Sequence, residues 1–165
     1  MRDLKKEVLK AQESGDIAKL YVLEQRAQDE LGEDELMRYY SNILELALER
    51  LTDVLEKKVR MDMNDVQDFA TLRALYEYAV EHYSAGGLHD ASALFEVLSG
   101  LSHDKAFSDA MKIHQKAADA KMSLDDFINQ IADIEATQSA GTFYVSVFTN
   151  EAQKLLSDSK KSAEK

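Results

Sequence analysis

The chain has 165 residues, of which 45% are hydrophobic and 31% charged, a balance typical of a folded globular protein. Cysteine is absent, which excludes disulfides, thiolate metal sites and a cysteine nucleophile, and the absence of proline favours helices joined by short polar connections. The formal net charge of −11 disfavours nucleic acid and anionic membrane surfaces as partners.

Apolar residues recur at steps of three and four along the first half of the chain, the spacing of one helix face. Two short helices are expected before Gly32, separated by a Ser-Gly-Asp stop at residues 14–16. The clearest run follows and predicts a long helix over 34–60 with one apolar stripe. After a break, Asn64 or Asp65 is expected to cap the next helix.

Four more helices are expected in the second half of the chain, because the same apolar spacing resumes after each short polar connection. A glycine pair at 86–87 ends the first of them, and Ser123 is expected to cap the last. Their apolar positions span residues 66–83, 91–101, 107–117 and 124–134.

Residues 142–148 are the one segment with strand character, since β-branched and aromatic residues dominate it. The spacing of Tyr144 and Val147 also fits a helix, and no other strand is available as a partner for its backbone groups. We therefore predict a helix there. The absence of a long linker predicts a single helical domain over 1–156, followed by a flexible Lys/Ser-rich tail over 157–165.

The segment around Gly86 combines a tight turn with small and large apolar residues at fixed spacings. Two helices approach closely only where both present small side chains, and Ala79 and Ala91 occupy such positions on either side of the turn. Phe95 is expected to fill the wedge beside this contact, and Leu98 to pack against the first helix.

This unit is similar to a tetratricopeptide repeat (TPR), a helix–turn–helix of about 34 residues. Within that family, the hairpin at about 72–102 resembles the first repeat of the type III secretion chaperones that hold translocator proteins. The resemblance implies an all-α fold of antiparallel helical hairpins, a TPR-like array of seven to eight helices. In those chaperones the repeats form a concave groove that clamps a client segment. The positions of this sequence that match the groove-lining positions are Arg73, Tyr76, Val80 and Tyr83.

Motifs for metal, nucleotide or acyl-transfer chemistry are absent from the sequence, and no histidine has an acidic residue three positions before it. His82 and His89 flank the glycine turn, but their spacing matches no metal-ligand pattern. His114 lies on an apolar helix face, where a core histidine with one hydrogen bond is expected. We expect no enzymatic activity, no metal and no cofactor.

The sequence thus predicts a bacterial, cytoplasmic protein that binds another protein, as a secretion chaperone or adaptor. Acidic side chains outnumber basic ones over residues 61–150, which favours a basic or amphipathic partner segment and no membrane insertion. Tyr76, Val80 and Tyr83 are expected to supply the apolar contact and Arg73 a polar anchor. The alternative is a self-associating structural or regulatory helical bundle, a homodimer whose seam is the long helix 34–60.

Overall fold

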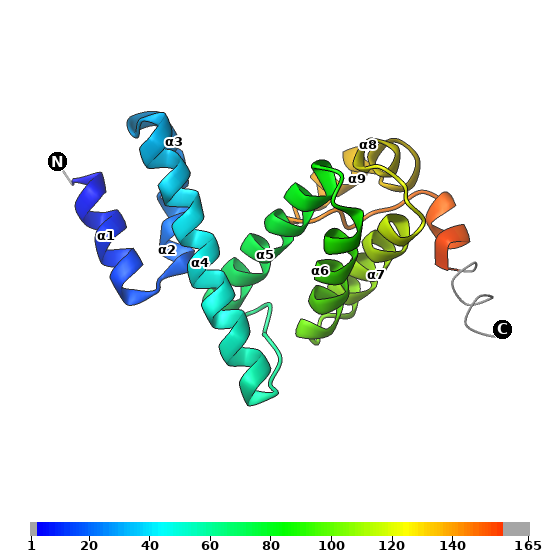
Figure 1. The fold of residues 1–165 in the computed structure, drawn as a ribbon, viewed down its shortest axis with the longest axis horizontal. Helices are drawn as coiled ribbons and strands as arrows, with labels where there is room; N and C mark the ends of the chain where they lie inside the picture. The colour runs from blue at the N-terminus through cyan, green and yellow to red at the C-terminus, as the bar shows by residue number, and fades with distance from the viewer. Residues whose placement is uncertain (1–2, 157–165) are drawn as a thin grey trace. The chain divides into compact units, whose positions relative to one another are not determined.

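The computed structural model describes residues 3–156, and apart from isolated β-bridge residues their regular structure is helical (Figure 1). The predicted all-α fold class is confirmed. The predicted tail, 157–165, lies outside the described residues. In chain order the helices are α1 (Leu4–Ser14), α2 (Ile17–Val22), α3 (Glu24–Glu30), α4 (Glu33–Lys57), α5 (Val66–Ser84), α6 (Leu88–Leu101), α7 (Lys105–Asp119), α8 (Leu124–Asp126), the π-helix η1 (Phe127–Ile131), α9 (Ile134–Ala140) and a last helical stretch at 151–156.

The chain divides into two compact units, Met1–Leu75 (unit 1) and Tyr76–Lys165 (unit 2). The boundary falls inside α5, whose first residues belong to unit 1 and whose last residues belong to unit 2. One helical domain over 1–156 remains the prediction from the sequence, and each of the two units buries apolar side chains of its own.

Unit 1 begins with three short helices, and local capping explains the first stop. Gly15 ends α1 with a φ of 68°, a conformation that costs glycine little. The Asp16 carboxylate then accepts a hydrogen bond from the amide of Lys19 and caps α2. The single helix predicted after this stop is broken at Leu23, which is buried between α2 and α3.

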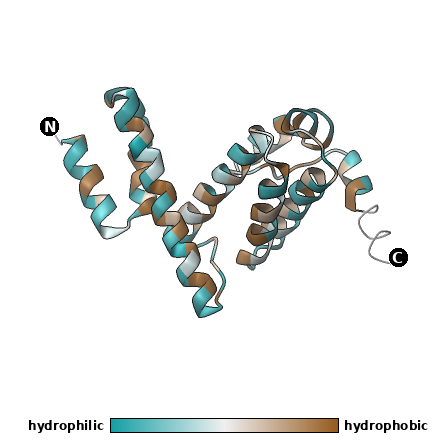
Figure 2. Ribbon diagram, in the orientation of Figure 1, coloured by the Kyte–Doolittle hydropathy of each residue, from teal (hydrophilic) through white to brown (hydrophobic). Residues whose placement is uncertain are grey.

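Helix α4 is the longest element and runs for 25 residues. Lys58, with a φ of 55°, ends it before the predicted boundary at residue 60. Polar and apolar turns alternate along its ribbon (Figure 2). The buried side of α4 consists of Tyr39, Ile43, Ala47 and Val54.

The core of unit 1 is small, and it joins α4 to the preceding helices. The Tyr39 hydroxyl donates a hydrogen bond to the carbonyl of Leu20, whose own side chain is fully buried. Desolvation raises the pKa of Tyr39, so the phenol keeps its proton and the hydrogen bond persists across the physiological pH range. The position of α4 against α2 is fixed by this contact.

In unit 2, helices α6 and α7 lie side by side (Figure 1). The Asp104 carboxylate accepts a hydrogen bond from the amide of Phe107 and caps α7. One face of α7 is buried almost along its whole length. The residues of this face are Phe107, Ala110, Met111, Ile113, His114, Ala117 and Ala118.

The predicted last helix, at 124–134, is only partly regular. Ser123 caps α8 as expected, since its hydroxyl accepts a hydrogen bond from the amide of Asp126. The chain then widens into the π-helix η1, which buries Phe127 and Ile131.

The helix predicted over 142–148 is wrong, because this segment is irregular, with a bend at 143–144 and one bridge residue, Phe148. Phe148 forms an isolated antiparallel bridge with Ala132, and the amide of Asp133 donates to the carbonyl of Val147 at 2.9 Å. The loop between η1 and α9 therefore supplies the backbone partners that the sequence did not reveal.

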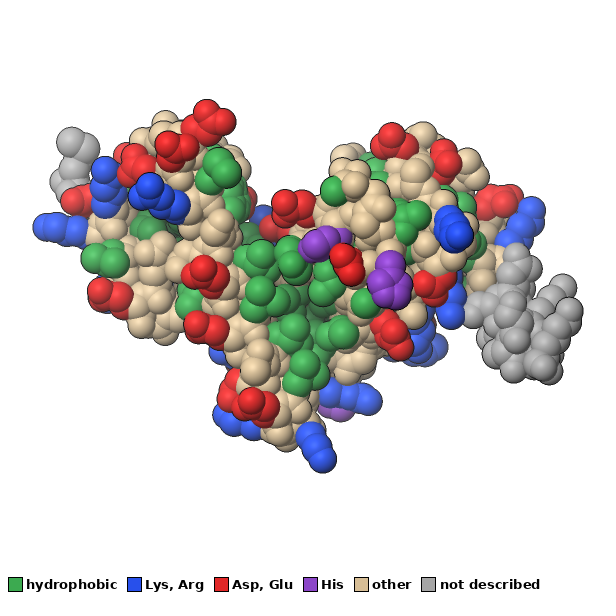
Figure 3. Space-filling view, in the orientation of Figure 1, with side chains coloured by type: hydrophobic (Ala, Val, Ile, Leu, Met, Phe, Trp, Pro, Cys, Tyr) green, Lys and Arg blue, Asp and Glu red, His purple; other side chains and the backbone are tan. Residues whose placement is uncertain are grey.

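Acidic side chains are scattered over the face in Figure 3 rather than gathered in one place. The net charge of −11 thus produces no single acidic surface on that face. Among the described residues, no helix is both long and apolar enough to span a membrane.

Candidate functional site

The two tyrosines predicted to face a partner are core residues, and that prediction is corrected here. Tyr76 is only 5% exposed and Tyr83 only 1%. The Tyr83 hydroxyl donates to the carbonyl of Met122 at 2.8 Å, while the ring of Tyr76 lies against Phe143. In an isolated hairpin this face is open. Here the chain after α7 and the irregular segment 142–148 cover it.

The other two predicted partner-binding residues are more accessible, but they lie in different units. Val80 is half-buried in the part of α5 that belongs to unit 2. Arg73 is half-buried in unit 1, where its guanidinium lies 4.0 Å from the ring centroid of Tyr21 and 3.4 Å from a carboxylate oxygen of Glu24. Arg73 is therefore the one predicted residue that we keep as a candidate partner-binding residue.

The predicted repeat residues lie where close packing of two helices needs them. Ala79, Ala91 and Phe95 are completely buried, and Leu98 nearly so. Gly86 has a φ of 87°, a conformation that side chains other than glycine rarely adopt. Ala79, Ala91, Phe95 and Leu98 thus build the interior of unit 2, and Gly86 forms the exposed turn beside it.

A chain of hydrogen bonds crosses the aromatic interior of unit 2. His114 Nδ1 lies 2.7 Å from the carbonyl of Ala110, so this nitrogen must carry the proton. His114 Nε2 therefore accepts a hydrogen bond from the Tyr76 hydroxyl, at 2.8 Å. The Tyr76 oxygen in turn accepts from the amide of Val145, at 3.1 Å. The sequence predicted one hydrogen bond for His114, and the structure gives it two.

Burial lowers the pKa of His114 to about 4. The hydrogen-bond chain agrees with this direction, because a second proton on Nε2 would point at a hydroxyl that already accepts from Val145. The ring is 1% exposed and packs against Phe95 and Phe127, with centroid distances of 4.9 and 4.8 Å. His114 is thus a neutral structural group.

An open pocket of about 270 Å³ lies in unit 1, between α2, the start of α5 and the loop that precedes α5. We call it the α2–α5 pocket. Two of its apolar residues remain accessible, since Val66 is 68% and Phe69 42% exposed. Its lining residues are Ala18, Tyr21, Met63, Asn64, Val66, Phe69, Ala70 and Arg73.

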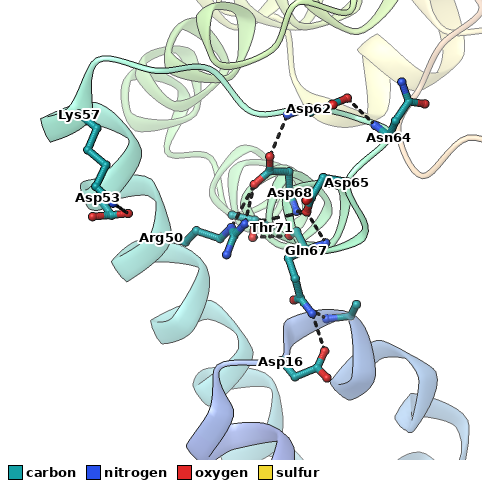
Figure 4. Close-up of polar contacts among 11 residues, drawn as sticks. Asp16, Arg50, Asp53, Lys57, Asp62, Asn64, Asp65, Gln67, Asp68 and Thr71 are labelled. Carbon is teal, nitrogen blue, oxygen red and sulfur yellow. Dashed lines mark hydrogen bonds and ion pairs between the residues drawn. The ribbon is translucent and has the colours of Figure 1, made fainter.

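Gln67 ties the two walls of the α2–α5 pocket together (Figure 4). Its side-chain nitrogen donates to the Asp16 carboxylate at 2.6 Å, and its side-chain oxygen accepts from the amide of Ala18 at 3.2 Å. Both partners lie at the start of α2, so this one side chain sets the distance between α2 and α5.

The loop before α5 is fixed by a second polar group, which Figure 4 also shows. The Arg50 guanidinium of α4 donates twice to one carboxylate oxygen of Asp68, at 2.8 and 3.1 Å. The other Asp68 oxygen accepts from the amide of Asp62 at 2.9 Å. Because Asp68 is mostly buried, the loop has a defined path across the pocket wall.

Asp65 lies between the pocket-lining residues Asn64 and Val66 and caps the helix that forms one pocket wall. Its carboxylate accepts hydrogen bonds from the amides of Asp68 and Gln67, at 3.0 and 2.9 Å, and so caps α5. These bonds, first that from Asp68, lower the pKa of Asp65. Asp62 and Asp65 are exposed and adjoin the lining residues 63, 64 and 66, and the Arg50 guanidinium lies 3.9 Å from the Asp65 carboxylate.

The sequence contained the apolar residues of this pocket but not their exposure. Val66 and Phe69 continue the stripe that includes Leu72, so the pattern assigned all three to the core. Only Leu72 is completely buried. Periodicity identifies an apolar face, but the number of neighbours that cover it is a property of the tertiary structure.

Within residues 3–156, no group of three or more histidine or acidic side chains is placed to hold a metal ion. No family model, curated protein or solved structure matches this chain. The site itself is therefore the basis for a functional proposal.

Proposed function

We propose that this protein is a non-enzymatic binding protein whose α2–α5 pocket receives an amphipathic segment of a partner protein. The observation that carries the proposal is the exposure of Val66 and Phe69 at the mouth of an apolar pocket whose walls are fixed by Gln67 and Asp68. A preformed pocket of this kind costs little ordering free energy when a partner enters.

The size of the pocket favours a single large side chain as its occupant. Sites for whole small molecules typically enclose roughly 300–1,000 Å³, and this pocket, at about 270 Å³, lies below that range. An aliphatic or aromatic side chain of the partner would contact Phe69 and Tyr21, while Asp62 and Asp65 would attract a basic neighbour on the same segment. We therefore expect an amphipathic segment with a basic flank.

The resemblance to type III secretion chaperones supports a finer proposal, in which the partner is an exported client. Such a client would occupy the α2–α5 pocket, with Arg73 retained at its edge. Tyr76 and Tyr83 would take no part, since both are buried in unit 2.

Site-specific photo-crosslinking in the cells that make the protein tests this proposal. A photoreactive residue at Val66 should trap a partner, whereas the same residue at Val22 should not. Val22 is the matched control because it is also a valine, is 72% exposed, and lies in unit 1 outside the pocket lining. Equal trapping at the two positions would reject the pocket as the binding site.

The captured partner, once purified, gives a quantitative test. Phe69→Asp should weaken binding on the order of tenfold or more, since it places a charge in the apolar mouth, and Val22→Asp should leave binding unchanged. A circular dichroism melt of each variant confirms that unit 1 remains folded. Undiminished binding by folded Phe69→Asp would contradict the proposal.

A further inference from the structure

Helix α4 carries a second apolar stripe whose two end residues are exposed and whose middle is half-buried. The single stripe predicted from the sequence is in fact two, and the buried one contains Tyr39, Ile43, Ala47 and Val54. The second begins with Met37, which is 64% exposed, and ends with Leu55, which is 55% exposed. Its members are Met37, Leu44, Leu48, Leu51 and Leu55, the middle three of which are half-buried.

This second stripe has the spacing of a coiled-coil seam. Its residues follow one another at steps of seven, four, three and four, with Ser41 at the one polar position of the repeat. With Ser41 included, the steps alternate between four and three as in a heptad repeat, and this keeps an apolar seam facing a partner helix. At 3.6 residues per turn, the stripe is centred roughly 110° round the helix from the buried side. Contact with a second helix would therefore leave the core of unit 1 intact.

From this spacing, and from the charges at the ends of α4, we infer that the stripe is the seam of a homodimer in which two copies of α4 pack antiparallel. The first turn carries Glu33, Asp34 and Glu35. The last turn carries Glu56 and Lys57, of which Lys57 pairs with Asp53 of the same helix, and Lys58 and Arg60 follow, so that this end is basic on balance. A parallel pair would place acidic ends together and basic ends together. An antiparallel pair places each acidic end beside a basic one.

The antiparallel register follows from pairing the first residue of the stripe with the last residue of the stripe in the second copy. Pairing Met37 with Leu55 of the second copy brings Leu44 opposite Leu48 of that copy. The same register places Asp34 beside Lys58 of the second copy, and all of these charged residues are exposed. The helix macrodipoles also oppose one another in this arrangement. Since α4 is already helical within unit 1, association need not include the cost of forming it.

The self-association itself is tested with the full chain by analytical ultracentrifugation over a range of concentrations. We expect a reversible dimer. Leu55→Glu should raise its dissociation constant at least about 100-fold, because each dimer loses two leucine contacts. Leu9→Glu is the matched control, since Leu9 is 54% exposed and lies on α1 of the same unit. A chain that stays monomeric, or a dimer that Leu55→Glu leaves unchanged, would overturn the inference.

Disulfide trapping decides the direction of the helices, and the chain has no cysteine to interfere. A mixture of Met37→Cys and Leu55→Cys chains should form a crosslinked heterodimer on oxidation. Each variant alone should not crosslink, because its two copies of the new cysteine would lie about 27 Å apart along the helices, whereas a disulfide requires Cα atoms within about 7 Å. Efficient crosslinking of either variant with itself would overturn the antiparallel arrangement.

Discussion

At the scale of single residues, His114 shows how burial and hydrogen bonding together select one protonation state. Both ring nitrogens have partners in unit 2, and the partners suit only the neutral ring with its proton on Nδ1. Tyr76, which the sequence placed in a binding groove, is the donor that completes this arrangement. A residue type favoured at binding surfaces therefore serves the interior here.

The stability of unit 2 should depend on pH through His114. Its pKa is lowered from 6.5 to about 4 on folding, so the unfolded chain binds more protons between these values. The stabilisation is complete above pH 6.5 and is lost as the pH falls towards 4, by on the order of 3 kcal/mol. Denaturant unfolding followed across this range measures the effect.

The contribution of His114 is isolated by comparing two substitutions. His114→Gln should flatten the dependence between pH 6.5 and 4, although it also lowers stability at neutral pH by removing a buried ring. His89→Gln changes an exposed histidine of the same unit and should retain the wild-type slope. The same slope in both variants would show that His114 does not titrate as described.

At the scale of elements, the sequence predicted long amphipathic helices well and irregular segments poorly. Helices α4, α6 and α7 have several turns of apolar spacing and clear ends, so local pattern and tertiary packing agree. Neither the break at Leu23 nor the π-helix η1 is signalled by apolar spacing or by a helix-ending residue in the sequence. Residues 142–148 were assigned to a helix because their backbone partners lie in a loop around Ala132, where no pattern signals a strand.

The candidate site was also predicted only in part from the sequence. Arg73 was selected from its place in a helical hairpin, and it does lie at a pocket, but at one in unit 1. Phe69 was treated as core although 42% of it is exposed. A single sequence identifies the apolar face of a helix. The exposure of that face depends on which other elements pack against it, and the prediction that Phe69 is buried was wrong for this reason.

The turn between α5 and α6 gives a prediction at this scale, because two glycines of one hairpin differ in conformation. Gly86 has a φ of 87°, so Gly86→Ala should destabilise the protein by about 1 kcal/mol. Gly100 lies within α6 with open space around its Cα, and Gly100→Ala should instead stabilise by about 0.5–1 kcal/mol. Thermal melts of the two variants in parallel measure this. Shifts of the same sign would contradict our description of the turn.

At the scale of the whole molecule, the charges at the two ends of helix α4 are more informative about association than the net charge of the chain. The net charge of −11 is scattered, yet α4 has an acidic start and a basic end. Such a helix matches its own macrodipole, and it is also complementary to an antiparallel copy of itself. The same few charged side chains thus stabilise the helix and favour the proposed dimer.

Charge reversal at the ends of α4 should expose this second role. Glu33→Lys with Asp34→Lys should weaken self-association, and so should Lys57→Glu with Lys58→Glu, because each change places like charges together. All four changes in one chain should restore the dimer, even though they oppose the helix dipole twice. Sedimentation at low salt, where surface charges are least screened, is the suitable measurement. Failure of the fourfold variant to recover would argue against pairing of these ends.

The hydrogen bond between the amide of Val145 and the Tyr76 hydroxyl spans 69 positions of the sequence, and it has a consequence for how the protein is made. As the chain leaves the ribosome, unit 1 has every residue it needs once Leu75 has emerged. The contacts that Tyr76 makes with Phe143 and Val145 can form only after the segment 142–148 has been synthesised, so we expect its ring to remain solvated until then. Unit 2 therefore receives its last packing residues later than unit 1, only after Phe148 has been synthesised.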